Sequence, residues 1–127
     1  MTTTPSLLDV VQQFLKHSER GDYDRAMVLI SKDCADINPP PLGAVRGAVA
    51  VRGVLDPFVP SLVNEFKVLR KSSTEPVVFT ERFDRHRLSD GWVDLAVTGV
   101  FEARDGQISH WRDYFDAATI LSAWPTA

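Results

Sequence analysis

The fold is decided by residues 77–115, which read VVFTERFDRHRLSDGWVDLAVTGVFEARDGQISHWRDYF. Two Asp-Gly pairs, Asp90-Gly91 and Asp105-Gly106, divide this stretch into three runs of strand length. An Asp-Gly pair between such runs is a strong signal for a β-hairpin turn. We therefore predict an antiparallel meander with turns at Ser89-Asp90-Gly91 and Arg104-Asp105-Gly106. Its strands, and one further strand before them, are predicted over Phe66–Ser72, Val77–Leu88, Trp92–Ala103 and Ile108–Phe115.

The residues before the sheet follow a helical spacing. Ser6 can cap a helix that ends at Gly21, and Asp22 can cap a second one. The run Pro39-Pro40-Pro41 forbids helix and makes a stiff turn. The remaining expected elements are a short extended piece around Ala35–Asn38, a helix over Gly47–Leu55 stopped by Pro57 and Pro60, and a helical tail from Ala117 to about Trp124. Helices first and strands later predict an α+β fold, with one domain over residues 1–127 and helices on one face of a sheet.

Composition excludes several classes of protein. The 127 residues are 44% hydrophobic and 24% charged, which excludes a disordered chain, a collagen-like fibre and a coiled-coil rod. The formal net charge is -3, without the basic surplus typical of a nucleic-acid binder. The one cysteine, Cys34, cannot form an internal disulfide. Because the sequence shows no bilayer-spanning apolar run and no signal peptide, we expect a cytoplasmic protein that binds neither nucleic acid nor membrane.

Strand parity gathers charged residues on one face of the predicted sheet. Alternate residues of a strand point the same way, so Arg82, Asp84 and His86 share a face of the first meander strand. On the last strand, Asp113 lies between two aromatic residues on a face that reads as inward and apolar. A carboxylate there is costly unless a cation pairs with it, and Arg82 is the candidate partner.

Two carboxylates and one arginine in an apolar cup suit acid/base chemistry. The arginine can hold one carboxylate ionised as a base, while the apolar wall keeps the other protonated as an acid. Such a site can activate a water and protonate a leaving oxygen without a metal or a cofactor. The competing interpretation is a surface ion pair, which Arg-x-Asp on a strand commonly forms. The histidines His17, His86 and His110 lack the spacing of metal ligands, so no metal site is predicted.

Several motifs, in their order along almost the whole chain, resemble the limonene-1,2-epoxide hydrolase family. Thr80-Glu81-Arg82-Phe83-Asp84 looks like that family's T-E-R-x-D strand. Its last hairpin is matched by Gly99-Val100-Phe101, by Asp105-Gly106-Gln107-Ile108 and by Trp111-Arg112-Asp113-Tyr114-Phe115-Asp116. Residues 10–33 and the run Gly47-Ala48-Val49-Ala50-Val51 fit the helices before the sheet, which the wider SnoaL-like superfamily shares.

The resemblance implies a SnoaL-like, cone-shaped α+β barrel, in which a curved, mostly antiparallel sheet wraps round N-terminal helices and encloses a deep pocket. It also implies a cofactor-independent epoxide hydrolase that adds water to a small, largely apolar epoxide to give a vicinal diol. By this resemblance Asp113 is the general base that activates the water, Asp84 is the acid that protonates the epoxide oxygen, and Arg82 bridges the two. Asn38 matches an asparagine that helps to position the water. The expected apolar lining comes from the first helix and from the inward faces of the strands, including Leu95, Val97, Trp111 and Phe115.

Two positions depart from the family pattern. Asp36 stands where the family usually has a water-holding tyrosine; it can hold the water, compete with Asp113 as base, or raise the pKa of Asp113. His86 stands where the resemblance implies an apolar pocket residue. Both changes make the pocket more polar than one built for a terpene epoxide. Two alternatives stay open: a SnoaL-like polyketide cyclase or isomerase with Asp36 as base, and a small-molecule binding module without chemistry.

The resemblance also implies a homodimer. Val77, Phe79 and Phe83 give an independent indication, because they place apolar surface on the strand face opposite the site. The alternative is that the tail helix of the same chain covers them.

Overall fold

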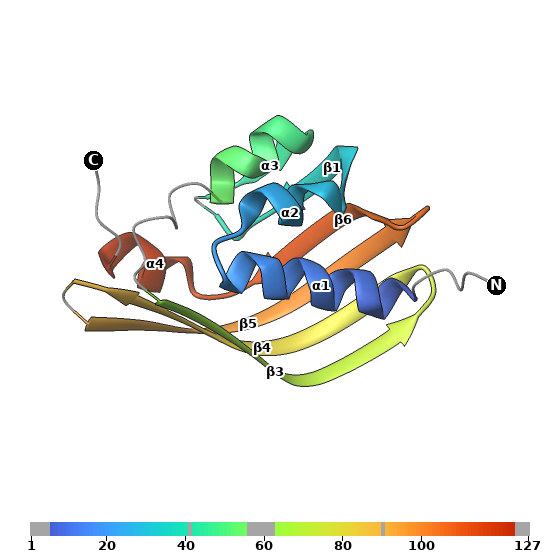
Figure 1. Cartoon of the computed structure of the whole chain (residues 1–127). Coiled ribbons are helices and arrows are strands. Elements are labelled where there is room, and N and C mark those ends of the chain that lie inside the picture. Colours follow the sequence, from blue (N-terminus) through green and yellow to red (C-terminus); the bar gives the residue numbers. More distant parts are fainter. Residues whose placement is uncertain (1–5, 41, 56–62, 90, 124–127) are drawn as a thin grey trace.

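The computed structural model describes residues 6–40, 42–55, 63–89 and 91–123 (Figure 1). Its helices are α1 (Leu7–Glu19), α2 (Tyr23–Val28), α3 (Ala48–Leu55) and α4 (Ala117–Ala123). Its strands are β1 (Ile30–Ile37), β2 (Ala44–Arg46), β3 (Val63–Thr74), β4 (Val77–Leu88), β5 (Gly91–Arg104) and β6 (Gln107–Tyr114). Within these residues the strands form a six-stranded sheet in the order β2-β1-β6-β5-β4-β3.

The sheet is antiparallel at every neighbouring pair except one. Strands β3 to β6 form the predicted meander in sequence order, while β1 pairs parallel with β6 and antiparallel with β2. Three helices precede most of this sheet, so the predicted α+β class is confirmed. Register irregularities in β3 and β5, between Val68 and Arg70 and between Glu102 and Ala103, interrupt the ladders where the sheet curves.

The turn between β5 and β6 has the conformation that its sequence favours. Asp105 has φ 54° and Gly106 has φ 77°, so both central residues adopt the positive φ that a type I′ turn requires. Such a turn matches the twist of the flanking strands and fixes their register. The other predicted turn contains Asp90, which lies outside the described residues; Gly91 after it has φ 128°.

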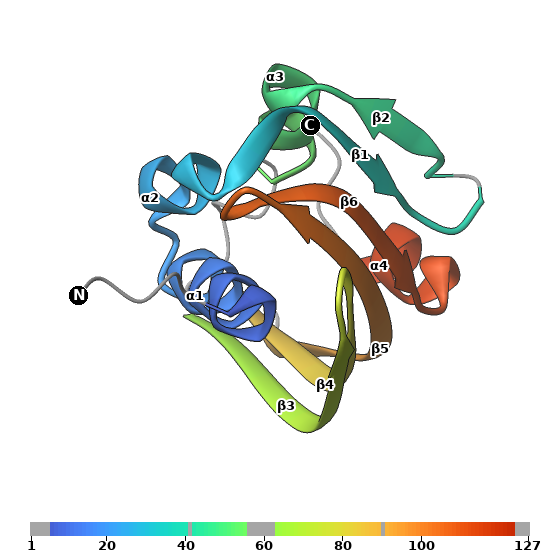
Figure 2. The same cartoon turned by 90° about the vertical axis from the view of Figure 1, so that its right-hand side faces the viewer.

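Helix α1 fills the concave side of the sheet. Ser6 caps it by accepting a hydrogen bond from the Asp9 amide at 3.1 Å, as predicted. Its apolar stripe includes Val11 and Phe14, which are both completely buried. Figure 2 shows α1 lying inside the curve that β3 to β6 make, with α2 beside it. This packing closes one side of the interior, because the inward residues of the strands face the same helix.

Some elements differ from the sequence-based expectation. Strand β1 begins at Ile30, directly after α2, although the sequence predicted only a short extended piece from Ala35. The three-residue strand β2 was not predicted, because so short a segment carries no periodicity of its own. Strand β3 is longer than expected at both ends, and Phe115 lies just beyond the end of β6. The predicted positions Pro41, Pro57, Pro60 and Trp124 lie outside the described residues.

Burial alternates along the central strands and separates an inner from an outer face. In β5 the inner positions from Val93 to Ala103 are buried at every second residue, as the period of a strand requires. In β4 the inner positions include polar residues, and Thr80, Arg82 and Asp84 are all buried. Strand β4 therefore carries charged side chains into the interior. Among the described residues no helix is long and apolar enough to cross a membrane.

Candidate active site

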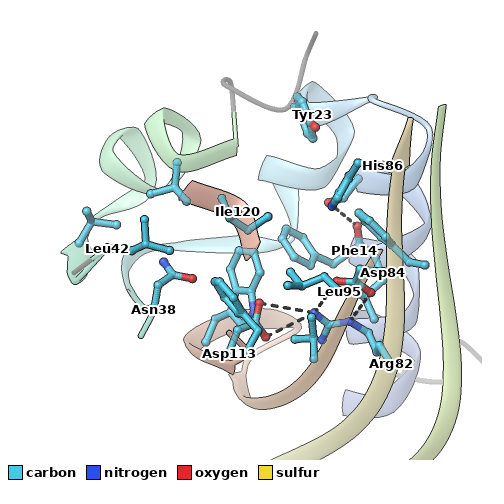
Figure 3. Close-up of a pocket in the computed structure, with 18 of the residues that line it drawn as sticks. Phe14, Tyr23, Asn38, Leu42, Arg82, Asp84, His86, Leu95, Asp113 and Ile120 are labelled. Atoms are coloured by element: carbon cyan, nitrogen blue, oxygen red, sulfur yellow. Dashed lines mark hydrogen bonds and ion pairs between the residues drawn. The ribbon is translucent and has the colours of Figure 1, made fainter. Parts of the chain in front are cut away.

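The charged residues of β4 and β6 meet in one buried cluster. Arg82 donates from Nε to Asp84 Oδ1 at 3.2 Å and from Nη2 to Asp84 Oδ2 at 3.1 Å. The same Nη2 lies 3.4 Å from each carboxylate oxygen of Asp113. Figure 3 shows these contacts, with the Arg82 guanidinium between the two carboxylates. The arginine is 2% exposed and both aspartates are 7% exposed, so this is not the surface ion pair of the competing interpretation.

The register of the sheet places the cluster. Residues 82 and 84 follow each other on the inner face of β4, so a single arginine can make a two-point contact with the aspartate. Asp113 comes from β6, on the far side of β5, and Arg82 therefore reaches across one strand. Its remaining terminal nitrogen, Nη1, donates to Thr80 Oγ1 at 3.0 Å, which fixes the plane of the guanidinium. Thr80 shares the predicted inner face but was not singled out in the sequence.

A cavity of about 410 Å³ opens onto this cluster. Its walls come from all four described helices, from β3 to β6 and from the segment around β2, and most of the lining is apolar. The predicted residues among the lining are Asn38, Arg82, Asp84, His86, Leu95, Val97, Trp111, Asp113 and Phe115. The first helix contributes lining as expected, through residues that include Phe14 and Ser18. The structure adds Tyr23, Phe66, Ile120 and Leu121, which come from other helices and an edge strand whose packing the sequence does not specify.

Burial and pairing act in opposite directions on the charges of the cluster. Burial raises the pKa of Asp84 and of Asp113, while the Arg82 guanidinium opposes the rise at both. Burial also works to lower the pKa of Arg82, but the charges of Asp113 and Asp84 outweigh it and raise this pKa. Two carboxylates thus share one cation. A single proton held between them makes the buried cluster neutral, which is the arrangement that a water-poor interior favours.

Asp36 is the predicted site residue that does not line the cavity. It lies on β1 opposite Trp111 of β6 and is completely buried. Burial raises the pKa of Asp36 to about 7, the charge of Asp113 adds to the rise, and Asn38 acts against it. Neither carboxylate oxygen makes a hydrogen bond of ordinary geometry with a described residue. The charge of Asp113 therefore favours the neutral form of Asp36. Asn38, two residues later, reaches the cavity.

His86 contributes a polar atom to an apolar wall. Its Nδ1 lies 2.7 Å from Asn64 Oδ1 on β3, and its ring packs edge-on against Phe66. Burial lowers the pKa of His86 to about 4, so the ring is neutral at neutral pH. Asn64 was not predicted as a neighbour, because its register opposite His86 depends on the position of β3. Among the described residues no group of three potential metal ligands occurs.

Comparison with solved structures places the fold. A structure described as a putative SnoaL-like polyketide cyclase from Shewanella putrefaciens matches with a TM-score of 0.79 at 10% identity, over 93% of this chain and 84% of that one. Bal32a, from a soil-derived mobile gene cassette, matches with a TM-score of 0.81 at 15% identity, over 94% and 96%. At such identities the likeness shows the fold alone. The chain therefore has the SnoaL-like α+β fold, with a cavity between sheet and helices.

Sequence comparison narrows this class to a family. A model of the limonene-1,2-epoxide hydrolase catalytic domain matches residues 5–126. Epoxide hydrolase EphG of Mycobacterium tuberculosis is 31% identical over 106 residues, which are 84% of this chain and 70% of that protein. The structure of an LEH-like epoxide hydrolase from M. tuberculosis matches with a TM-score of 0.79 at 28% identity, over 93% of this chain and 88% of that one. The chain belongs to the limonene-1,2-epoxide hydrolase family.

Proposed function

We propose that this protein adds an activated water to a small, largely apolar epoxide and that Asp113, Arg82 and Asp84 carry the reaction. Family membership makes the chain an epoxide hydrolase of the limonene-1,2-epoxide hydrolase type. The observation that supports the proposed mechanism is the single buried arginine that contacts both carboxylates at the wall of the cavity. Such a cluster supplies a base and an acid side by side.

The proposed reaction transfers two protons and exchanges one bond. Asp113 takes a proton from water as the water oxygen attacks an epoxide carbon. The bond from that carbon to the epoxide oxygen breaks, its electron pair stays on the oxygen, and Asp84 gives that oxygen a proton. The product is a vicinal diol. Arg82 holds both carboxylates in place throughout and offsets the negative charge that remains, while Asn38 helps to hold the water.

The substrate decides where the shared proton sits. Arg82 lies closer to Asp84 than to Asp113 in the structure, which favours the ionised form of Asp84. An epoxide oxygen can only accept a hydrogen bond, so a carboxyl group beside it must carry the proton. A water beside Asp113 donates a hydrogen bond and favours the ionised form there. In the proposed complex the proton is therefore on Asp84, ready for the epoxide oxygen.

The cavity supports an apolar substrate rather than a highly charged one. Most of the lining is apolar, and its polar groups gather at the Arg82 cluster and at His86. A volume of about 410 Å³ lies in the range of pockets for small organic ligands. Because the imidazole of His86 is neutral and polar, the proposed substrate class includes epoxides with a polar substituent remote from the epoxide group.

Substitution at the two carboxylates tests this proposal. With a panel of small cyclic and styrene-type epoxides, we expect Asp113→Asn and Asp84→Asn each to lower diol formation by at least about 100-fold, the scale of general acid/base catalysis. The matched control is Asp94→Asn on neighbouring β5, where an exposed aspartate pairs with Arg85 at 2.8 Å. Diol formation near the wild-type rate by a folded Asp113→Asn variant would overturn the assignment of the base.

The two alternatives give different results in the same assay. A cyclase or isomerase with Asp36 as base requires Asp36→Asn to be more damaging than Asp113→Asn. The position of Asp36 behind the cavity wall favours Asp113 for contact with water. A binding module requires that wild-type protein bind apolar ligands and convert no epoxide on the panel, a result that contradicts the proposed function.

We also propose that the protein forms a homodimer through the outer face of the meander. Phe79 on β4 is 46% exposed there, and Phe83 on the same face is partly exposed. Helix α4 does not cover this face of β4, because its residues Ile120 and Leu121 line the cavity on the other side of the sheet. A second copy of the chain would remove this apolar surface from water.

A further inference from the structure

The buried inner row of β5, from Val93 to Ala103, contains one residue without a side chain. The buried positions of this row include Val97, Gly99 and Phe101, and Gly99 lies at the centre of the strand. Its φ lies outside the left-handed region, whereas Gly43, Gly91 and other glycines of the chain have positive φ. The backbone therefore does not require glycine at this position. Glycine inside a strand costs conformational entropy and often marks a close approach of another group.

The close approach at Gly99 comes from the catalytic cluster. Gly99 pairs with Thr80 on one side and with Asp113 on the other, so these residues form a row across β4, β5 and β6. A Cβ atom placed on Gly99 would lie 2.5 Å from Arg82 Nη1 and 2.9 Å from Asp113 Oδ1. Both distances are below the 3.0 Å that real Cβ contacts respect. The guanidinium of Arg82 and the carboxylate of Asp113 therefore occupy the space that a side chain at position 99 would fill.

Arg82 has little room to move away from an added methyl group. Its side chain is 2% exposed, and on the β4 side it donates two hydrogen bonds to Asp84 and one to Thr80. Phe101 limits the space further, because its Cε2 would lie 2.9 Å from the same Cβ. The contacts from Arg82 to Asp113 are the longest in the cluster, at 3.4 Å. A methyl group on residue 99 would therefore separate Arg82 from Asp113 first.

We propose that Gly99 is a positioning residue, which leaves a gap in β5 through which Arg82 reaches from β4 to Asp113 on β6. Alternate strands of a sheet lie about 9.5 Å apart, so the arginine must pass over the inner face of the strand between them. Any side chain at this crossing would stand in its path. The gap at Gly99 thus allows Arg82 to contact both Asp84 on its own strand and Asp113 on β6. Its catalytic meaning rests on the proposed function, but the geometry it enforces can be measured without substrate.

The Gly99→Ala variant tests this inference, with Gly53→Ala as the matched control. Gly53 lies in α3 and has an ordinary φ, and a Cβ atom added to it would have no other atom within 4 Å. The first readout is the pKa of the Asp113 carboxyl, followed by NMR of ¹³C-labelled aspartate in substrate-free protein. A nearby cation lowers an aspartate pKa by about 1–3 units, so we expect a rise of about one unit in Gly99→Ala and no change in Gly53→Ala.

The second readout is the pH profile of diol formation. When Arg82 no longer contacts Asp113, the acid limb of the kcat/KM profile of Gly99→Ala should move to higher pH by about one unit, as the pKa of Asp113 does. We expect kcat at neutral pH to fall about 10-fold with little change in KM, because the cavity wall is not otherwise altered. A purely structural role for Gly99 would lower stability without moving the Asp113 titration or the acid limb.

A second pair of variants keeps the test decisive if Gly99→Ala alone does not fold. Phe101→Leu removes the ring that crowds the added methyl group, so the effect of Gly99→Ala is then measured in the Phe101→Leu background. An unchanged Asp113 pKa in a folded protein that carries Gly99→Ala, in either background, would overturn the inference. If wild-type protein forms no diol while the Asp113 pKa still rises in Gly99→Ala, the proposed function fails and the positioning role of Gly99 stands.

Discussion

At the scale of residues, the buried carboxylates of Asp36 on β1, Asp84 on β4 and Asp113 on β6 differ in whether they contact Arg82. Asp84 and Asp113 contact Arg82 directly and line the cavity. Asp36 is equally buried, makes no such contact, and lies behind the cavity wall. Burial away from any cation favours the neutral form of a carboxylate, and together with the charge of Asp113 it raises the pKa of Asp36 to about 7. Asp36 is therefore a source of pH-dependent stability.

The Asp36→Asn variant should lose this dependence. From about pH 4 to about pH 7 the folded protein keeps a proton on Asp36 that the unfolded chain releases, so the wild-type free energy of unfolding falls as pH rises. A pKa raised from 3.8 to about 7 corresponds to roughly 4 kcal/mol. Compared with wild type, Asp36→Asn should gain up to this amount between about pH 4 and about pH 8. Urea unfolding across this range measures it.

The titration of His86 does not affect the difference between Asp36→Asn and wild type. The lowered pKa of His86 acts in the opposite sense, because the protein loses stability as pH falls from about 6.5 toward about 4. The effect is present in both wild type and variant, so it cancels in their difference. A difference in unfolding free energy that stays constant with pH would contradict the buried, unpartnered state of Asp36.

At the scale of elements, Glu19 holds the end of α1 against the edge strand β3. Its Oε2 accepts a hydrogen bond from the Phe66 amide at 2.6 Å, a backbone group that the sheet edge leaves unpaired. This contact spans 47 residues of sequence and sets the distance between helix and sheet where Phe66 lines the cavity. The width of the cavity at this end therefore depends on one carboxylate.

We expect Glu19→Ala to lower the free energy of unfolding by roughly 1–3 kcal/mol, because the Phe66 amide loses its acceptor. Glu19→Gln keeps an acceptor oxygen and should lose less than half as much. Chemical denaturation of the two variants measures both values. Equal losses of unfolding free energy in Glu19→Ala and Glu19→Gln would show that the contact between Glu19 and Phe66 depends on charge rather than on the hydrogen bond.

The elements also show what the sequence could and could not predict. The meander and the inner placement of Arg82, Asp84 and Asp113 follow from local turns and strand parity, which depend on neighbouring residues only. The parallel pairing of β1 with β6 joins segments far apart in the chain, and no local pattern specifies it. For the same reason the sequence did not reveal that Asp36 lies behind the wall. The role of Gly99 depends on the register across β4, β5 and β6, although a glycine inside a strand was a visible signal.

At the scale of the whole molecule, one curved sheet serves two purposes. Its inner face curves round α1 (Figure 2) and borders a cavity that Arg82, Asp84 and Asp113 line (Figure 3). Its outer face carries the exposed Phe79 and the partly exposed Val77 and Phe83. The proposed active site and the proposed dimer interface thus lie on opposite faces of the same strands, so changes in one need not disturb the other.

We expect Phe79→Asp to disrupt the homodimer. Light scattering should give wild-type protein a mass near twice the 14.2 kDa of the chain and give Phe79→Asp the mass of one chain. Val28→Asp is the control, because Val28 is 70% exposed on α2, away from the outer face of β4. A monomeric wild-type protein, or a dimeric Phe79→Asp variant, would contradict this interface.

In the proposed mechanism Asp113 activates water instead of attacking the epoxide itself. A single turnover in H₂¹⁸O, with enzyme in excess over epoxide, separates the two, because attack by a carboxylate would place an enzyme oxygen in the first diol. We expect every first-turnover diol to contain one ¹⁸O atom from the solvent. A first-turnover diol without ¹⁸O, with the label found on Asp113 instead, would contradict the proposed role of Asp113 as general base.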